Sequence, residues 1–178
     1  ATLSLLAPGR FILGIGAGWK GEEYLSYGYE FPEASARIGA LAEGVQIIRR
    51  MWTEDVVSFH GKYFNIANAY CSPKPKPKPP IMIGGGGEKL LLKVVACYAD
   101  WWNCPNLTVE EYKHKLEVLR HHCQRTKRRY EEIKKTWLGC IALADTKEEA
   151  LQIAEGNPFV TKETRFDAMQ STLIGTPE

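Results

Sequence analysis

The chain has 178 residues, 44% of them hydrophobic and 25% charged, which fits one globular domain with a sizeable core and excludes a disordered chain. Its net charge of only +2 gives no reason to expect nucleic-acid binding, which requires clustered basic residues. No apolar run approaches the roughly 20 residues that cross a bilayer, and the first residues lack the features of a signal peptide, so we expect a cytoplasmic protein without a membrane partner.

The first half of the chain alternates strand and helix patterns. Residues 10–16, Arg-Phe-Ile-Leu-Gly-Ile-Gly, are a short continuous apolar run that predicts a strand buried on both faces. Two β-like runs, at 56–59 and 63–66, predict a hairpin. Between these regions, from residue 36, apolar residues recur at intervals of three and four and predict an amphipathic helix with a buried face of Ile38, Leu41, Val45, Ile48 and Trp52.

The second half begins with alternating prolines at 73–80, which predict an extended and stiff segment. Short apolar runs predict strands at 81–83, 100–104 and 137–144. A helix is expected at 88–98, between the first two of these strands, because its apolar residues have helical spacing.

Two capping boxes mark the start of the later helices. Thr108 precedes Glu111 by three residues, and Thr146 precedes Glu149 by the same interval. The chain therefore has four strands that alternate with helices, plus one inserted hairpin, which is the pattern of a parallel α/β architecture. An open doubly wound sheet and a (β/α)₈ barrel share this local pattern, and a complete barrel needs about 250 residues. Periodicity alone leaves both architectures open.

Four consecutive glycines join a predicted strand directly to a predicted helix: Gly84, Gly85, Gly86 and Gly87. Without Cβ atoms, they allow the backbone to approach a ligand closely. The free N–H groups at the start of the following helix, near Glu88, favour an anion such as phosphate. The alternative is a tight turn that needs glycine only for its geometry. A turn rarely needs four glycines, so we favour the anion site.

A second glycine cluster, Gly14-Ile-Gly-Ala-Gly18, follows the first predicted strand. Together with Gly21 it satisfies the G-x-G-x-x-G pattern of Rossmann dinucleotide-binding folds. That motif requires a helix that opens at the loop, yet residues 19–32 contain glycine and proline and lack helical spacing. No acidic residue lies at the usual distance after a second strand either. We therefore do not expect Rossmann-type binding.

Arg37 opens the long helix and is a permanently charged, forked donor that suits phosphate. The alternative is an exposed salt bridge to Glu33 or Glu43, and both interpretations stay open. Trp19 lies at the carboxyl end of the first strand, where barrel enzymes place reactive groups. Because an indole does not transfer a proton in neutral water, the sequence assigns no catalytic acid.

The five cysteines are widely spaced, odd in number and contain no C-x-x-C pair, which argues against a disulfide framework and a structural zinc site. The four histidines show no H-E-x-x-H pattern. His121 and His122 are adjacent, so on a helix they would point in different directions. We expect no metal site and reduced, mostly buried thiols.

Several stretches occur in the order and spacing of the luciferase-like monooxygenase superfamily, and the chain resembles in particular its branch that uses the deazaflavin coenzyme F420. The matching stretches lie at 9–19, 22–24, 27–28, 37–43, 59–64, 73–75, 79–89, 98–103 and 174–178. The resemblance implies an α/β fold, a (β/α)₈ TIM barrel of the bacterial-luciferase-like kind. Residues 1–178 would form a single, partial domain with strands four to seven, which lacks the first three and the last βα units. The absence of an initiator methionine fits a chain that begins inside a longer gene product, and a naturally short homologue is the alternative.

The resemblance also implies a cofactor site. The ring of coenzyme F420, or alternatively of FMN, would lie against Gly16, Ala17 and Gly18. Glu22 or the nearby backbone would hydrogen-bond the pyrimidine edge of the ring. The cofactor phosphate would lie at the four-glycine loop, and relatives of this kind commonly form homodimers.

The expected activity is hydride transfer between reduced F420 and a small organic substrate, because the cofactor carries the difficult chemistry. The sequence shows no nucleophile with an adjacent base and no paired carboxylates, which fits this expectation. One alternative is an FMN-dependent monooxygenase that activates oxygen. Another is a catalytically silent flavoprotein or an interaction module, whose working surface would be the hairpin at 56–66 and the Lys-Pro run.

Overall fold

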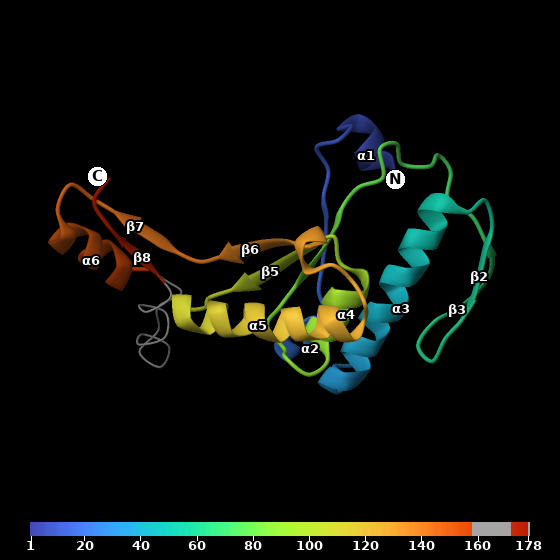
Figure 1. Ribbon diagram of the computed structural model, residues 1–178, viewed down its shortest axis with the longest axis horizontal. Coiled ribbons are helices and arrows are strands. Elements are labelled where there is room, and N and C mark those ends of the chain that lie inside the picture. The colour runs from blue at the N-terminus through green and yellow to red at the C-terminus, as the bar shows by residue number, and fades with distance from the viewer. Residues whose placement is uncertain (158–171, 178) are drawn as a thin grey trace.

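The computed structural model describes residues 1–157 and 172–177, and its main sheet has four parallel strands (Figure 1). The strands follow one another in chain order: β1 (Leu13–Ile15), β4 (Ile81–Gly84), β5 (Trp101–Pro105) and β6 (Lys134–Leu138). A doubly wound sheet would reverse its strand order at a switch point. The sequential order found here is that of a barrel wall.

Three helices cover one face of the main sheet: α3 (Ala34–Thr53), α4 (Leu91–Tyr98) and α5 (Val109–Arg125). Alternate strand residues such as Ile81, Ile83 and Trp102 point to this face and are almost fully buried. They pack with apolar residues of the helices, including Val45, Leu92, Val95, Leu119 and Cys123. This helix-covered face therefore holds the hydrophobic core of the described chain.

The opposite face of the sheet bears the larger Met82 and Trp101, but small and polar residues lie at the carboxyl ends of its strands. Because neighbouring strands are parallel and in register, Gly14 lies beside Met82, and Gly84 lies beside Asn103. Asn103 in turn lies beside Thr136. In complete barrels, bulky branched side chains usually fill this inward face. Here the small residues near the carboxyl ends of the strands leave room for a ligand.

Two short helices precede α3, α1 (Thr2–Leu6) and α2 (Gly21–Ser26). The prediction that residues 19–32 contain no helix is therefore wrong. A helix of six residues is too short for its periodicity to be recognised, although Glu22 and Glu23 in its first turn favour a helix start. None of its residues is buried, so α2 does not pack on the sheet as the first helix of a Rossmann unit does.

The predicted hairpin is confirmed as β2 (Val57–His60) and β3 (Asn65–Ala69), an antiparallel pair. Its second strand begins two residues later than expected because the turn is held by α3. The Glu43 carboxylate accepts hydrogen bonds of 2.8–2.9 Å from the backbone N–H groups of Lys62, Tyr63 and Phe64. The hairpin thus lies against α3, at the far end of the molecule from the C-terminal unit (Figure 1).

The proline-rich segment was expected to be continuously extended, but it bends at residues 72–73 and 76–77. The peptide bonds before Pro73 and Pro77 are cis. Lys74 points its ammonium group at the last turn of α3 and donates to the carbonyl oxygens of Met51, at 2.8 Å, and Glu54, at 2.5 Å. A cation at a helix C-terminus is stabilising, so the segment is fixed to α3 before it enters β4.

The strand expected at 137–144 is wrong as a single element. β6 ends at Leu138, and the chain resumes as β7 (Ile141–Leu143), which pairs with β8 (Leu173–Gly175) in a separate sheet. The break is at Gly139, where the ring of Trp137 occupies the space that a Cβ atom would need. With α6 (Lys147–Glu155), β7 and β8 form a small C-terminal unit beyond the main sheet (Figure 1).

The helix starts were predicted with mixed success. The first capping box is confirmed, because the Thr108 side chain accepts from the Glu111 N–H and the Glu111 carboxylate accepts from the Thr108 N–H. At α6 the Thr146 hydroxyl accepts from the Glu149 N–H, which is half of the expected box. A single 3₁₀ turn, η1 (Tyr130–Glu132), links α5 to β6. Among the helices of the described chain, none combines the length and apolar character that crossing a bilayer requires.

Candidate functional site

A cavity of about 550 Å³ opens at the carboxyl ends of the main strands. This volume lies within the range of small-molecule and cofactor sites. Each strand of the main sheet contributes to its wall, together with the segment after β1 and the first turns of α3 and α4. The lining residues are Gly14, Ile15, Gly16, Ala17, Gly18, Trp19, Arg37, Ile38, Met82, Gly84, Gly85, Gly87, Leu91, Asn103, Pro105 and Leu138.

The two glycine clusters of the sequence meet at this cavity. β1 and β4 are adjacent and parallel, with Ile15 opposite Ile83, so their carboxyl ends lie at the same edge of the sheet. A Cβ atom built on Gly16 would lie 3.7 Å from the carbonyl oxygen of Gly84. The two strand ends therefore form one continuous surface of backbone, against which a planar group can lie.

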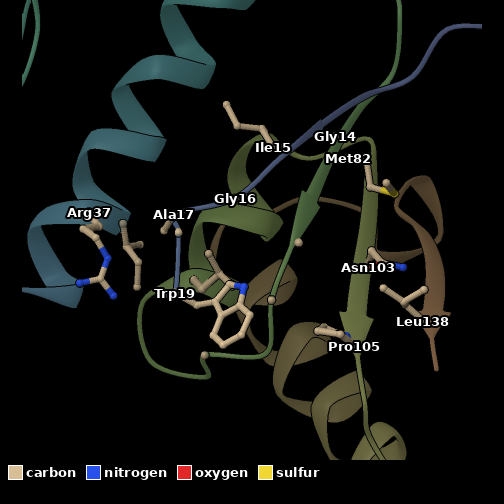
Figure 2. A pocket seen from close by; sticks show the side chains of 16 residues that line it. Gly14, Ile15, Gly16, Ala17, Trp19, Arg37, Met82, Asn103, Pro105 and Leu138 are labelled. Carbon is tan, nitrogen blue, oxygen red and sulfur yellow. The ribbon is translucent and has the colours of Figure 1, made fainter. Parts of the chain in front are cut away.

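Side chains from β4, β5 and β6 form the facing part of the wall (Figure 2). Met82, Pro105 and Leu138 are apolar, whereas Asn103 is the polar residue among them. The Asn103 amide donates a 2.9 Å hydrogen bond to the Thr136 hydroxyl, which in turn donates to the Trp102 carbonyl oxygen at 3.0 Å. This chain of bonds fixes the amide orientation and leaves the Asn103 side-chain oxygen available to a ligand.

Arg37 stands on the opposite side of the cavity, near Trp19 and Ala17 (Figure 2). Its guanidinium carbon lies 3.8 Å from the centroid of the Phe31 ring, and one terminal nitrogen donates to the Pro32 carbonyl oxygen. Its Nε is buried and has no hydrogen-bond partner in the part of the chain that the structure describes. The expected alternative, a salt bridge to Glu33 or Glu43, is wrong, since the ion pairs of the described residues do not include Arg37. A buried, unpaired donor at a cavity wall fits an anionic or carbonyl ligand.

The four-glycine loop is fixed to β5 at its start. Gly85, at a φ of +124°, donates its N–H to the Asn103 carbonyl oxygen at 2.9 Å. Its carbonyl oxygen accepts from the Trp102 indole N–H at 2.8 Å. By contrast, the N–H groups of Gly86 and Gly87 donate to no protein group within residues 1–157 and 172–177. Two adjacent free N–H groups are a feature of backbone anion sites.

The helix that follows the loop begins later than predicted. α4 starts at Leu91 rather than at residue 88, because residues 88–90 form a turn that directs Glu88 towards α5. The Glu88 carboxylate lies 2.5 Å from the Lys115 ammonium group and 3.2 Å from Nε2 of His114. The hydrogen bond from Lys115 holds the pKa of Glu88 below its ordinary value. The N–H groups expected to favour an anion therefore belong to the loop itself and not to a helix that begins at residue 88.

A buried thiol lies behind the loop. Cys104 is almost fully buried, and a Cβ atom on Gly86 would lie 3.0 Å from its Sγ. Burial raises the pKa of Cys104 to about 11, although the positive charge of Lys115 opposes this shift. At neutral pH the thiol is therefore protonated and acts as a packing group rather than a nucleophile.

The structure brings together most of the predicted cofactor-binding residues, but not all of them. Gly16, Ala17, Gly18, Arg37, Gly84, Gly85 and Gly87 line the cavity. Gly86 does not, and a Cβ atom there would lie 3.0 Å from Sγ of the buried Cys104. Glu22 lies exposed on α2, away from the cavity wall, so its expected contact with a ring edge is not supported.

Several wall residues were missed by the sequence analysis. Met82 lies two residues before Gly84 on the same strand, so strand alternation alone would have placed it on the cavity face. Ile38 is adjacent to Arg37, but it was assigned to the buried helix face. Leu138 was missed because β6 was predicted to start and end in the wrong places. No group of three or more potential metal ligands occurs in the described part of the chain.

A partial parallel barrel with a glycine-lined cavity at its carboxyl edge defines a class of ligand-binding (β/α)₈ proteins. A sequence profile of the luciferase-like monooxygenase family matches residues 1–175, and the chain belongs to this family. Over 99 residues it is 40% identical to an F420-dependent glucose-6-phosphate dehydrogenase from Amycolatopsis mediterranei, an alignment that covers 56% of this chain and 28% of that protein.

Solved structures give the same fold. An F420-dependent secondary alcohol dehydrogenase in complex with an F420-acetone adduct matches with a TM-score of 0.79 at 21% identity, over 96% of this chain and 54% of the other. The monooxygenase RslO1 from Streptomyces bottropensis matches with a TM-score of 0.76 at 21% identity, over 99% and 57%. The chain thus spans about half the length of these structures, and the expected luciferase-like barrel fold is confirmed. The assignment of its strands to barrel positions four to seven stays a prediction.

Proposed function

We propose that the cavity binds coenzyme F420, with its ring on the glycine surface of β1 and β4 and its phosphate at the four-glycine loop. The observation that carries this proposal is the meeting of Gly16 and Gly84 at one edge of the sheet. The loop that follows Gly84 carries the N–H groups of Gly86 and Gly87, which donate to no protein acceptor among the described residues. One ligand with a flat head and an anionic tail can therefore contact both features.

The residues present fit such a group. The buried, unpaired Nε of Arg37 offers a second donor for an anion or for a polar ring edge. The apolar wall, with Met82 and Leu138, is suited to exclude water from a reacting centre. The relatives also support F420, because the Amycolatopsis glucose-6-phosphate dehydrogenase and the secondary alcohol dehydrogenase are both F420-dependent by name.

The activity that follows is hydride transfer between the reduced cofactor and a small organic substrate. The bound cofactor supplies the hydride chemistry, and this chain supplies orientation and surroundings. The glycine surface holds one face of the ring against the strands, so that a substrate approaches from the other face. Asn103, held by Thr136, is placed to orient a polar substituent through its amide oxygen. Among residues 1–157 and 172–177, those that line the cavity include no carboxylate or imidazole, so these residues provide no general acid or base there.

The proposal is tested by titrating the intact protein with oxidised F420 and, separately, with FMN, while following the fluorescence of each ring. We expect F420 to bind with a Kd below about 100 μM, which corresponds to a binding free energy of roughly 5.5 kcal/mol. Failure of both cofactors to bind at that concentration would overturn the proposal. Binding without turnover of any alcohol or sugar phosphate would instead favour a catalytically silent flavoprotein.

A second candidate is an FMN-dependent monooxygenase, which the structural likeness to RslO1 favours. It needs the same ring surface and the same phosphate site, because FMN also has a flat ring and a terminal phosphate. Oxygen consumption by the intact protein with reduced FMN distinguishes it from an F420-dependent dehydrogenase. A homodimer is proposed by analogy with the family, and light scattering of the purified protein tests it.

A further inference from the structure

The residue that follows the four-glycine loop is held by α5 at two points. The backbone carbonyl oxygen of Glu88 lies 2.8 Å from Nε2 of His122, and its carboxylate lies 2.5 Å from Nζ of Lys115. His114 adds a third contact, at 3.2 Å from the same carboxylate oxygen. All three partners belong to one helix, so the end of the loop is tied to a single rigid element.

These contacts complete a pair of attachments that enclose the free N–H groups. At the start of the loop, both backbone polar groups of Gly85 are bonded to β5. At its end, Glu88 is bonded to α5. The two residues between them, Gly86 and Gly87, have no side chains of their own to fix their conformation, and glycine has more backbone freedom to lose than any other residue. Their orientation therefore depends on these two attachments, together with the Leu92 N–H of α4, which donates to the Gly87 carbonyl oxygen at 2.9 Å.

The two α5 side chains act on the loop in different ways. A carbonyl oxygen only accepts, so Nε2 of His122 must carry the proton, in either the neutral or the charged imidazole. This hydrogen bond fixes the peptide plane after Glu88, and it does so whether the imidazole is neutral or charged. Lys115 is largely buried, with 19% of its side chain exposed, and its Cε would lie 3.8 Å from a Cβ atom on Gly86. Its positive charge thus lies directly behind the loop.

We infer that His122 and Lys115 are positioning residues, which hold the Gly86 and Gly87 N–H groups in the orientation that receives the cofactor phosphate. The identity of the ligand in this inference rests on the proposed function. The attachment of Glu88 to α5 through His122 and Lys115, which we call the clamp, does not depend on it. α5 thus has a role in the cofactor site although no α5 residue lines the cavity.

The clamp is tested first in the ligand-free protein by hydrogen exchange of the peptide that spans the loop. His122→Leu and Lys115→Met should each raise the exchange rate of the Gly85 amide, which is the loop N–H with a protein acceptor, about tenfold, as expected when a local attachment is lost. His122→Gln, which restores a donor, should return the rate towards that of the wild type. Matched controls on the same helix are His121→Leu and Lys113→Met, because both side chains are exposed and contact no part of the loop. Equal exchange in clamp and control variants would overturn the clamp.

The role towards the ligand is tested with paired cofactors that differ only in the phosphate. FMN and riboflavin form one pair, and the 5′-phosphate of the deazariboflavin core of F420 and the same core without phosphate form the other. For the phosphate-bearing member, His122→Leu and Lys115→Met should weaken binding by about tenfold, the lower end of the range seen when supports of metal ligands are removed. For the phosphate-free member, the change should stay below about twofold, because the ring surface on β1 and β4 is untouched.

The outcomes separate the two proposals. Equal losses for both members of a pair would overturn the positioning role and indicate a general effect on the cavity. Faster loop exchange with unchanged phosphate discrimination would also overturn it. If the wild-type protein binds neither pair, the proposed function fails, whereas the exchange measurement still decides whether the clamp exists.

Discussion

Replacement of Gly84 by alanine tests whether the glycine surface contacts a ligand or serves only as a turn. A Cβ atom on Gly84 has no heavy atom nearer than the Asn103 carbonyl oxygen at 4.0 Å, and Gly84 does not have a positive φ. The variant should therefore change the free energy of unfolding by less than about 1 kcal/mol. The new methyl group projects about 1.5 Å into the cavity. A ring in contact with the backbone, at about 3.5–4.0 Å, must then shift by more than 1 Å.

Gly85→Ala should give the opposite result. Gly85 has a φ of +124°, and a Cβ atom there would lie 2.5 Å from Cδ2 of Leu91. Backbone strain and overpacking together should destabilise the protein by about 2–3 kcal/mol, which lowers Tm by roughly 4–12 °C in a protein of this size. Gly85 is therefore a poor choice for testing ligand contact, because loss of stability would accompany any loss of affinity.

The two variants are compared by thermal melting and by fluorescence titration with F420. For Gly84→Ala we expect at least about a tenfold rise in Kd, or roughly 1.4 kcal/mol of binding free energy, with a nearly unchanged Tm. Gly175→Ala in β8 is the matched control, since a Cβ atom there meets nothing within 4 Å and lies outside the cavity. An unchanged Kd for Gly84→Ala would refute the assignment of the ring to this surface.

Three further predictions concern charged and titratable groups. Burial acts to raise the pKa of Glu43, but three backbone N–H groups of the hairpin turn hold it below its ordinary value. The stability that Glu43 contributes is thus present above about pH 4.3 and is lost as pH falls through the lower folded pKa. The Tm difference between wild type and Glu43→Gln should therefore shrink in acid, and a constant difference would contradict this. With its pKa near 11, Cys104 should be alkylated by iodoacetamide at pH 8 far more slowly than the half-buried Cys97, as peptide mass spectrometry can measure. Arg37→Met should weaken the binding of F420 about tenfold and reduce its salt dependence, whereas Arg37→Lys should retain the salt dependence; equal affinity in all three proteins would exclude contact with an anion.

The elements with long or distinctive patterns were predictable from the sequence. The 20-residue helix α3 shows its buried face in the spacing of Leu41, Val45 and Trp52. The capping box at Thr108 and the four-glycine loop each depend on local chemistry that a short stretch of sequence carries completely. The meeting of the two glycine clusters was predictable as well, because parallel neighbouring strands bring their carboxyl ends to one edge of a sheet.

Features that depend on contacts between distant segments were not predictable. The late start of α4 is set by the pairing of Glu88 with Lys115 across 27 positions. Likewise, the orphaned Nε of Arg37 results from the stacking of its guanidinium group on Phe31. In each case a tertiary contact outweighs the local preference, and no periodicity in the sequence records it.

A binding surface made of backbone atoms, as at the ends of β1 and β4, affects how such proteins change their ligand specificity. Where the contacting atoms belong to the peptide backbone, substitution has almost nothing to change, and any new side chain obstructs the surface. Variation in what the cavity accepts is then expected at side chains of its wall, such as Ile38, Met82 and Leu138. Libraries that randomise these three positions, and leave every glycine alone, are the economical route to new specificity.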